Sequence, residues 1–350
     1  MKDWPIIANK KLPEPVLKPE PELLFFCPVS RKNVKWQFSN VYNPAAVVKD
    51  GKVHLVYRAD DEPKGFKDIY GNEMVTCRLG YAVSGDGISF VNRPVPVLYP
   101  DEDGFKKYEW DGGCQDLHIV EGEDRRYYMN YTAWTGSFDG KKEITPFCDT
   151  LHTAVSDDLI NWKKCGPAFK DGADAAIVNA SRSGVIVTSL KDGRLIAKKL
   201  GGFYIMYYGH CGWIARSENL IEWKQVYGKD GKRVSLFPNF ISGTYAELSC
   251  EAGAAALLSE HGINYFFNAA KKTADNKLEW TQGQALIDSG DISKVKDFIK
   301  QPSLKPEYDW EKSGYCEAPA VVCNTIVRFN GKWLMYYGAA DKYIGLAKSE

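Results

Sequence analysis

Short apolar and aromatic segments alternate with polar turns along most of the chain, and this alternation recurs in a similar order five times. Each copy holds an apolar segment, a small turn, an aromatic segment and a segment similar to Leu-Ala-Xaa-Ser-Xaa-Asp-Leu-Xaa-Xaa-Trp. One such unit cannot bury its own apolar face, so this repetition is typical of units that stack or surround an axis. The copies are clearest over Asn43–Phe90, Gln115–Trp162, Val185–Trp223, Glu251–Ile287 and Glu317–Ser349.

The repeated segments are rich in β-branched and aromatic residues, and turns such as Lys-Asp-Gly and Phe-Asn-Gly precede several of them, which is typical of hairpins. Five copies therefore predict an all-β fold, a five-bladed β-propeller. Comparable positions recur about every 70 residues, longer than most repeats, so we expect long loops near the axis, where propellers bind ligands. A two-domain β-sandwich is the alternative, but no break in composition near the middle favours it.

Residues 1–40 differ from the rest because they carry six prolines, which disfavour helices and central strands. We expect a surface-wrapping N-terminal extension over residues 1–40 and a single propeller catalytic domain over residues 41–350. A short helix is expected from Ile292 to Ile299, with Asp291 as its cap.

Composition narrows the classes of partner. The 350 residues include 45 Lys plus Arg and 45 Asp plus Glu, so no net field attracts nucleic acid or an anionic membrane, and a neutral ligand fits better. Ten Trp and 20 Tyr suit a sugar, although most aromatic residues serve the core. No cofactor is indicated, and a homo-oligomer is left open.

The nine cysteines are scattered and form no Cys-Xaa-Xaa-Cys pair, which indicates reduced thiols rather than disulfides. Residues 1–24 contain no apolar run of the kind found in a signal peptide or membrane helix. We expect a cytoplasmic protein, although a periplasmic or secreted protein whose leader has been removed has the same appearance.

Three carboxylates are candidates for glycosidic bond cleavage, which requires a proton donor and a second group that activates an acceptor. Asp116 follows an uncharged stretch and precedes an apolar strand, so we expect burial to raise its pKa and suit it to acid catalysis. Glu247 and Glu251 flank Ser249 before a run of Gly and Ala, where one or both are expected to face a tight site. A turn-capping Asp and two solvated loop glutamates are the structural alternatives.

Further polar side chains mark the starts and ends of the repeated strands and are expected to project toward the channel. They are Asn43, Arg58, Asp60, Glu317 and Asp341. A surface ion-pair cluster is the alternative for Arg58 and Asp60. His118 and His210 are the histidines best placed for function, or else structural residues, and neither has neighbours at metal-ligand spacing, so no metal site is predicted.

The chain resembles a known family in several motifs: Asn43-Pro44-Ala45, Tyr57-Arg58-Ala59, Leu79-Gly80-Tyr81-Ala82 and, most specifically, Trp333-Leu334-Met335-Tyr336-Tyr337-Gly338-Ala339-Ala340-Asp341. These are similar to the mannoside phosphorylases and their β-mannosidase relatives, which are five-bladed propellers acting on β-mannosides. The resemblance implies that Asp116 is the proton donor, acting through a hydroxyl of the bound mannose. Gln115 and Leu117-His118 depart from the family's Glu and Pro-Arg at this point.

The resemblance also bears on the acceptor. The family's Lys-containing, phosphate-binding stretch aligns with Leu248–Ala256, which has no Lys and contains Glu251. A carboxylate repels phosphate and is able to activate water. The sequence therefore favours an inverting, exo-acting β-mannoside hydrolase, with Asp116 as acid, Glu251 or Glu247 as base, and β-1,2 linkage implied by the family.

Two alternatives stay open. One is a phosphorylase that uses inorganic phosphate as co-substrate and releases mannose 1-phosphate, with Arg182 and His210 as cationic contacts. The other is a non-catalytic mannoside-binding propeller, which the departures around Asp116 suggest. In each case the partner is a mannose-containing oligosaccharide.

Overall fold

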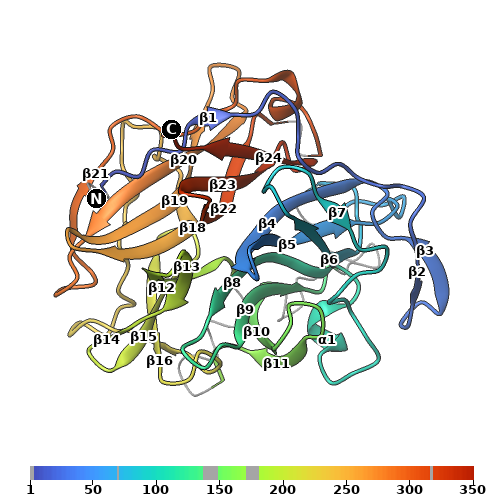
Figure 1. Ribbon diagram of the computed structural model, residues 1–350, viewed down its shortest axis with the longest axis horizontal. Coiled ribbons are helices and arrows are strands. Elements are labelled where there is room, and N and C mark those ends of the chain that lie inside the picture. The colour runs from blue at the N-terminus through green and yellow to red at the C-terminus, as the bar shows by residue number, and fades with distance from the viewer. Residues whose placement is uncertain (1–3, 69–70, 137–148, 171–180, 316–317) are drawn as a thin grey trace.

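The computed structural model describes residues 4–68, 71–136, 149–170, 181–315 and 318–350. Within them, antiparallel sheets of four strands surround a common axis (Figure 1). Consecutive strands pair as neighbours, as expected when each repeat folds into one twisted sheet. The prediction of an all-β, five-bladed propeller is confirmed.

Each blade is built mainly from consecutive segments. The strands of blade 1 are β4 (Asn40–Lys49), β5 (Lys52–Asp60), β6 (Cys77–Ser84) and β7 (Val91–Asn92); of blade 2, β8 (Gly113–Glu121), β9 (Tyr127–Trp134), β10 (Asp149–Ser156) and β11 (Lys163–Pro167); of blade 3, β12 (Gly184–Lys191), β15 (Phe203–Tyr208), β16 (Trp213–Ser217) and β17 (Lys224–Gln225); of blade 4, β18 (Ser249–Ser259), β19 (Gly262–Lys272), β20 (Leu278–Ile287) and β21 (Val295–Phe298); and of blade 5, β22 (Val321–Phe329), β23 (Lys332–Ala339), β24 (Tyr343–Lys348) and β1 (Lys10–Lys11).

Short elements lie between and outside these sheets. They are β2 (Leu24–Cys27) and β3 (Lys32–Lys35), which form a hairpin; β13 (Arg194–Ala197) and β14 (Lys199–Leu200) in blade 3; the one-turn helix α1 (Lys106–Glu109); and a 3₁₀ turn, η2 (Asp309–Glu311). No helix in the described ranges is long and apolar enough to cross a membrane.

The Ser-Xaa-Asp part of the repeat closes the turn after the third strand of a blade. In blade 2, the Asp158 carboxylate accepts the backbone N–H groups of Ile160 (2.9 Å) and Asn161 (2.7 Å), and Ser156 Oγ accepts that of Leu159 (2.9 Å). Burial alone raises the pKa of Asp158, but these N–H donors outweigh it and lower the pKa to about 2. The conspicuous polar residues of the repeat are therefore structural.

The N-terminal segment closes the ring of blades. Strand β1 pairs antiparallel with β24, so residues from both ends of the chain share one sheet. The expected helix from Ile292 to Ile299 is wrong, because Val295–Phe298 form β21 and pair with β20. The seven described cysteines are free thiols.

The innermost strands β4, β8, β12, β18 and β22 contact their neighbours around the axis. Four of them change register partway along, for example between Tyr42 and Ala45 in β4 and between Gln115 and His118 in β8. Such bulges re-aim side chains that a regular strand directs elsewhere. The candidate active site lies at the height of these bulges along the axis.

Candidate active site

A cavity of about 440 Å³ opens on the axis at the level of the bulges, and all five blades contribute to it. Its lining residues are Asn43, Arg58 and Asn72 from blade 1; Asp116 from blade 2; Arg182, Ser183 and His210 from blade 3; Glu251, Asn268, Lys277, Leu278 and Trp280 from blade 4; and Ala318, Ala320, Val322, Asn324 and Asp341 from blade 5. The size and the convergent polar groups fit a small-molecule site.

Most of the site residues expected from the sequence meet in this cavity. The seven that line it are Asn43, Arg58, Asp116, Arg182, His210, Glu251 and Asp341. Asp60 lies behind Arg58, His118 lines a second cavity, and Glu247 is exposed and does not line the pocket. Glu317 lies outside the described residues.

Asp116 is held by three donors, two from blade 1 and one from blade 3. Asn43 Nδ2 (2.8 Å) and Arg58 Nη1 (3.3 Å) donate to Oδ1, and Arg182 Nη2 donates to Oδ2 (2.5 Å). Asp116 and Asn43 both have φ of 44° and occupy corresponding bulges, which turns their side chains toward each other. The bulges therefore bring these two residues into contact across the boundary between blades 1 and 2.

The charge of Asp116 differs from the expectation. Burial alone raises the pKa of this carboxyl, but the Arg58 and Arg182 guanidiniums and the Asn43 amide outweigh it and hold the pKa well below its usual range. The expected raised pKa is therefore wrong. The sequence places Asp116 in an uncharged stretch, and the arginines that ionise it come from other blades.

Asp60 orders the arginine next to Asp116. Its buried carboxylate accepts hydrogen bonds from Asn40 Nδ2 (2.9 Å), Tyr42 OH (3.0 Å) and Arg58 Nε (3.2 Å). The Arg58 guanidinium also lies over the Tyr42 ring, 4.5 Å from its centroid. Asp60 thus acts on the pocket through Arg58.

Glu251 lies on the blade 4 side of the pocket. Ser183 Oγ donates to its Oε1 (2.6 Å), Arg182 Nε lies 4.0 Å from Oε1, and His210 Nδ1 lies 4.0 Å from Oε2. Arg182 thus contacts both Glu251 and Asp116, which limits their nearest oxygens to a separation of at most about 9 Å. This limit is compatible with two carboxyls on opposite sides of a scissile bond in an inverting enzyme.

Arg182 is the most heavily paired cation of the pocket. Besides Asp116 and Glu251, it faces Asp149 across 3.8 Å. Burial alone lowers the pKa of its guanidinium, but these carboxylates raise it well above the usual value. Arg182 therefore stays charged and links two carboxylates of blade 2 to one of blade 4.

Several lining residues were not anticipated, and the most informative are Lys277 and Trp280. They lie at the β19–β20 hairpin, and the Trp280 ring is 6.5 Å from that of His210. The signal in the sequence is the alternating Lys277-Leu278-Glu279-Trp280 after a polar turn, which starts a third strand with a large aromatic residue. Across the described parts of the chain, no group of three or more His, Cys, Asp or Glu is placed to hold a metal ion.

Comparison with known proteins identifies the family of the chain. A family model described as β-1,4-mannooligosaccharide phosphorylase matches residues 9–350. The chain belongs to the GH130 family of mannoside phosphorylases. It is 31% identical over 315 residues to a 1,2-β-oligomannan phosphorylase of Thermoanaerobacter sp., covering 89% of this chain and 90% of that protein. It is also 29% identical over 323 residues to a β-1,2-mannobiose phosphorylase of the same organism, covering 91% and 93%.

A solved structure is similar over the whole chain, with a TM-score of 0.89, 33% identity and coverage of 100% of this chain and 96% of that one. The description of that structure says that the GH130 family of mannoside phosphorylases contains glycoside hydrolases that target β-1,2 mannosidic linkages in Candida mannan. Membership of GH130 makes this chain an enzyme of the mannoside phosphorylase family.

Proposed function

We propose that this GH130 protein cleaves the terminal β-linked mannose of a mannooligosaccharide in the axial pocket and transfers it to inorganic phosphate, releasing mannose 1-phosphate. The support is that the curated relatives, matched over about nine-tenths of the chain, are phosphorylases of β-1,2-linked mannosides. These relatives support phosphorolysis over the hydrolysis that the sequence favours.

The observation in the pocket that supports phosphate is the gathering of basic side chains on one side. Arg182, His210 and Lys277 all line it, and Lys277 supplies a basic group that the stretch around Glu251 lacks. Phosphate oxygens are strong acceptors for such groups. A phosphate held there approaches the sugar from the side of blades 3 and 4, with Asp116 on the side of blades 1 and 2.

Asp116 remains the proposed donor, with one condition set by its charge. Two arginines stabilise its ionised form in the free enzyme. For Asp116 to carry a proton, the bound mannose must displace at least one of these contacts, which raises the pKa of the carboxyl. Asn43, Arg58 and Asp341 are the proposed contacts to the terminal sugar, Asp60 is proposed to act through Arg58, and Glu317 stays a proposed sugar contact.

Water is the second candidate acceptor, and Glu251 is the observation that favours it. Its carboxylate lies within 4.0 Å of both Arg182 and His210, where it competes with a phosphate dianion for the same basic side chains. A carboxylate in this position is suited to act as a general base toward water. Glu247 is the weaker alternative because it does not line the pocket.

Whether cleavage depends on inorganic phosphate distinguishes phosphate from water as the acceptor. We expect the purified protein to cleave β-1,2-mannobiose only when inorganic phosphate is present, forming one mannose 1-phosphate per bond broken. Equal release of free mannose with and without phosphate contradicts the proposal and supports hydrolysis. Binding of mannobiose without turnover in either buffer indicates a sugar-binding propeller.

A variant pair tests whether the turnover comes from this pocket. We expect Asp116→Asn to lower kcat at least about 100-fold, because general acid catalysis contributes roughly that much. Asp157→Asn, on an exposed turn of blade 2, is the matched control and should retain full activity. Full activity in Asp116→Asn excludes Asp116 as the proton donor.

A further inference from the structure

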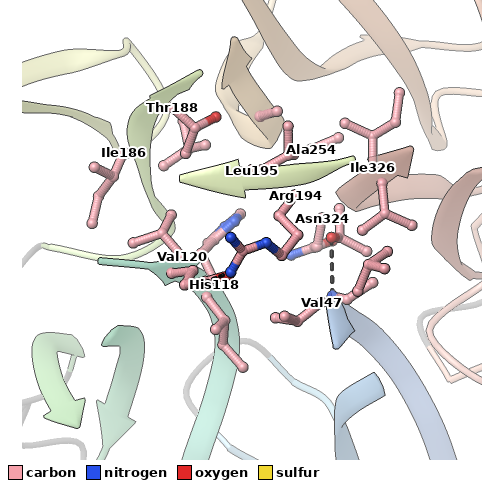
Figure 2. Close-up of a pocket in the computed structure, with 18 of the residues that line it drawn as sticks. Val47, His118, Val120, Ile186, Thr188, Arg194, Leu195, Ala254, Asn324 and Ile326 are labelled. Atoms are coloured by element: carbon pink, nitrogen blue, oxygen red, sulfur yellow. Dashed lines mark hydrogen bonds and ion pairs between the residues drawn. The ribbon is translucent and has the colours of Figure 1, made fainter. Parts of the chain in front are cut away.

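A second, smaller cavity lies on the propeller axis behind the active pocket. It has a volume of about 40 Å³ and is walled by the innermost strands of the blades together with β13, as Figure 2 shows around Val47, His118, Thr188, Ala254 and Asn324. Asn324 lines both this cavity and the active pocket, so the two cavities are adjacent. We call it the rear cavity.

Polar atoms without a protein partner surround the rear cavity, although its walls are largely apolar. The five atoms are His118 Nε2, Glu121 Oε2, Asn130 Oδ1, Thr188 Oγ1 and Asn324 Oδ1. None of these residues is more than 5% exposed. A buried polar atom without a hydrogen bond is costly, and ordered water is the usual partner in a polar cavity with room for it, which requires at least about 10–15 Å³.

A hairpin closes the far side of the rear cavity. Strand β12 pairs with β15 inside blade 3 as far as Ile186, and from Thr188 onward it pairs with β13 instead. The outer part of β12 lies parallel to β18, and β13 contacts β4, β8 and β22. The β12–β13 hairpin therefore touches the innermost strands of every blade and lies across the axis.

An ion pair fixes this hairpin in place. Arg194 extends from β13 toward His118 and Val120 in Figure 2, and its Nη1 donates to Glu121 Oε1 on β8. Glu121 is buried, whereas Arg194 is partly exposed at the far face. The guanidinium thus lies between the rear cavity and solvent.

We propose that the rear cavity is a closed site for ordered water, and that the β12–β13 hairpin keeps bulk water from reaching the active pocket from behind. The second part rests on the proposed phosphorolysis. There, the C1–O bond to the leaving sugar breaks, the leaving oxygen gains a proton, and a phosphate oxygen bonds to C1. Water that enters instead forms a C1–OH bond and yields free mannose. With substrate filling the pocket mouth, a sealed axis limits this competing reaction.

The water site is tested without reference to activity. In a crystal structure that resolves solvent, we expect ordered water within hydrogen-bond distance of Thr188 Oγ1 and Asn130 Oδ1, and a dry cavity overturns the proposal. Thr188→Val, which has nearly the same shape, should leave the Tm unchanged or lower it, because a hydrated hydroxyl is lost. A raised Tm shows that the hydroxyl is unsatisfied and also overturns the water site.

The seal is tested by the ratio of free mannose to mannose 1-phosphate formed from mannobiose in phosphate buffer. We expect Arg194→Ala to raise this ratio severalfold, and Arg216→Ala, an exposed arginine of blade 3, to leave it unchanged. Leu195→Ala opens the same hairpin without leaving Glu121 unpaired and serves as the second variant. An unchanged ratio in both hairpin variants overturns the proposed seal. A wild-type protein that forms no mannose 1-phosphate refutes the proposed function instead, and the crystallographic test of the water site still applies.

Discussion

The buried side chain of His152 in blade 2 makes the stability of the protein depend on pH. His152 is fully buried beside the rings of Phe105, Tyr108 and Tyr131, and burial together with the nearby Lys164 charge lowers the pKa of His152 to about 3. In the unfolded chain its pKa is near 6.5. Between these values the unfolded state takes up a proton and the folded state does not, so this histidine makes stability fall as pH falls.

We therefore expect His152 to reduce the free energy of unfolding by about 2 kcal/mol between pH 7 and pH 5. Urea unfolding at the two pH values measures this loss, and His152→Asn should show a loss that is smaller by that amount, whatever its stability at pH 7. His261→Asn, on the surface, is the control and should lose as much stability as the wild type. Parallel losses in His152→Asn and the wild type contradict the assignment.

At the same scale, the sequence anticipates which residues converge but not how they are charged. Asp116 lies within the register shift of β8, Glu251 lies just before that of β18, and both residues line the pocket. The charge state of Asp116 depends on Arg58 and Arg182, which are 58 and 66 residues away in the chain. Contacts between blades decide this, and no local pattern reports them.

At the scale of strands, a glycine on the third strand makes room for an aromatic ring on the second. Tyr57 lies directly opposite Gly80 in blade 1, and Tyr337 lies opposite Gly345 in blade 5. A Cβ at Gly80 would lie 2.4 Å from Tyr57 Cζ, and one at Gly345 would lie 2.3 Å from Tyr337 Cζ. The glycines in the repeated Leu-Gly-Tyr-Ala and Ile-Gly-Leu-Ala segments are therefore packing residues.

We expect Gly80→Ala to lower the free energy of unfolding by about 1–3 kcal/mol, because the added methyl group displaces the Tyr57 ring from its hydrogen bond with Gln37 (2.9 Å). Gly85→Ala is the matched control, since a Cβ there meets nothing within 4 Å. Urea denaturation of both variants provides the measurement. Equal stability of the two variants contradicts a packing role for Gly80.

The positions of the strands are the feature of the fold that the sequence predicts most reliably. Aromatic and β-branched alternation identifies the second and third strands because their faces pack between blades, as those of β5 and β23 do. It fails at β21, an edge strand whose Val295 and Phe298 are partly buried and whose Lys296 and Asp297 are exposed. The i, i+3 spacing of those two apolar residues resembles one turn of a helix, and only pairing with β20 determines the strand.

For the molecule as a whole, the ring of blades is closed by the N-terminal segment. Lys11 on β1 lies opposite Ala347 of β24, and its ammonium forms an ion pair with Glu311 (2.8 Å). The side chains of Lys11 and Glu311 are 3% and 0% exposed. Tyr337 OH donates to the other carboxylate oxygen of Glu311 (2.7 Å). Strand β1 is thus bound to blade 5 both by its backbone and by a buried charge pair.

We expect Lys11→Met to lower the free energy of unfolding by about 3–5 kcal/mol, because it leaves the Glu311 carboxylate buried without its cation. Adding Glu311→Gln to this variant should restore part of the loss, since an amide needs no counter-charge. Lys10→Met removes a surface ion pair with Glu350 from the same strand and should have no measurable effect. Urea unfolding of the three variants tests the closure: a Lys11→Met protein as stable as Lys10→Met means that the backbone pairing of β1 alone holds the ring together.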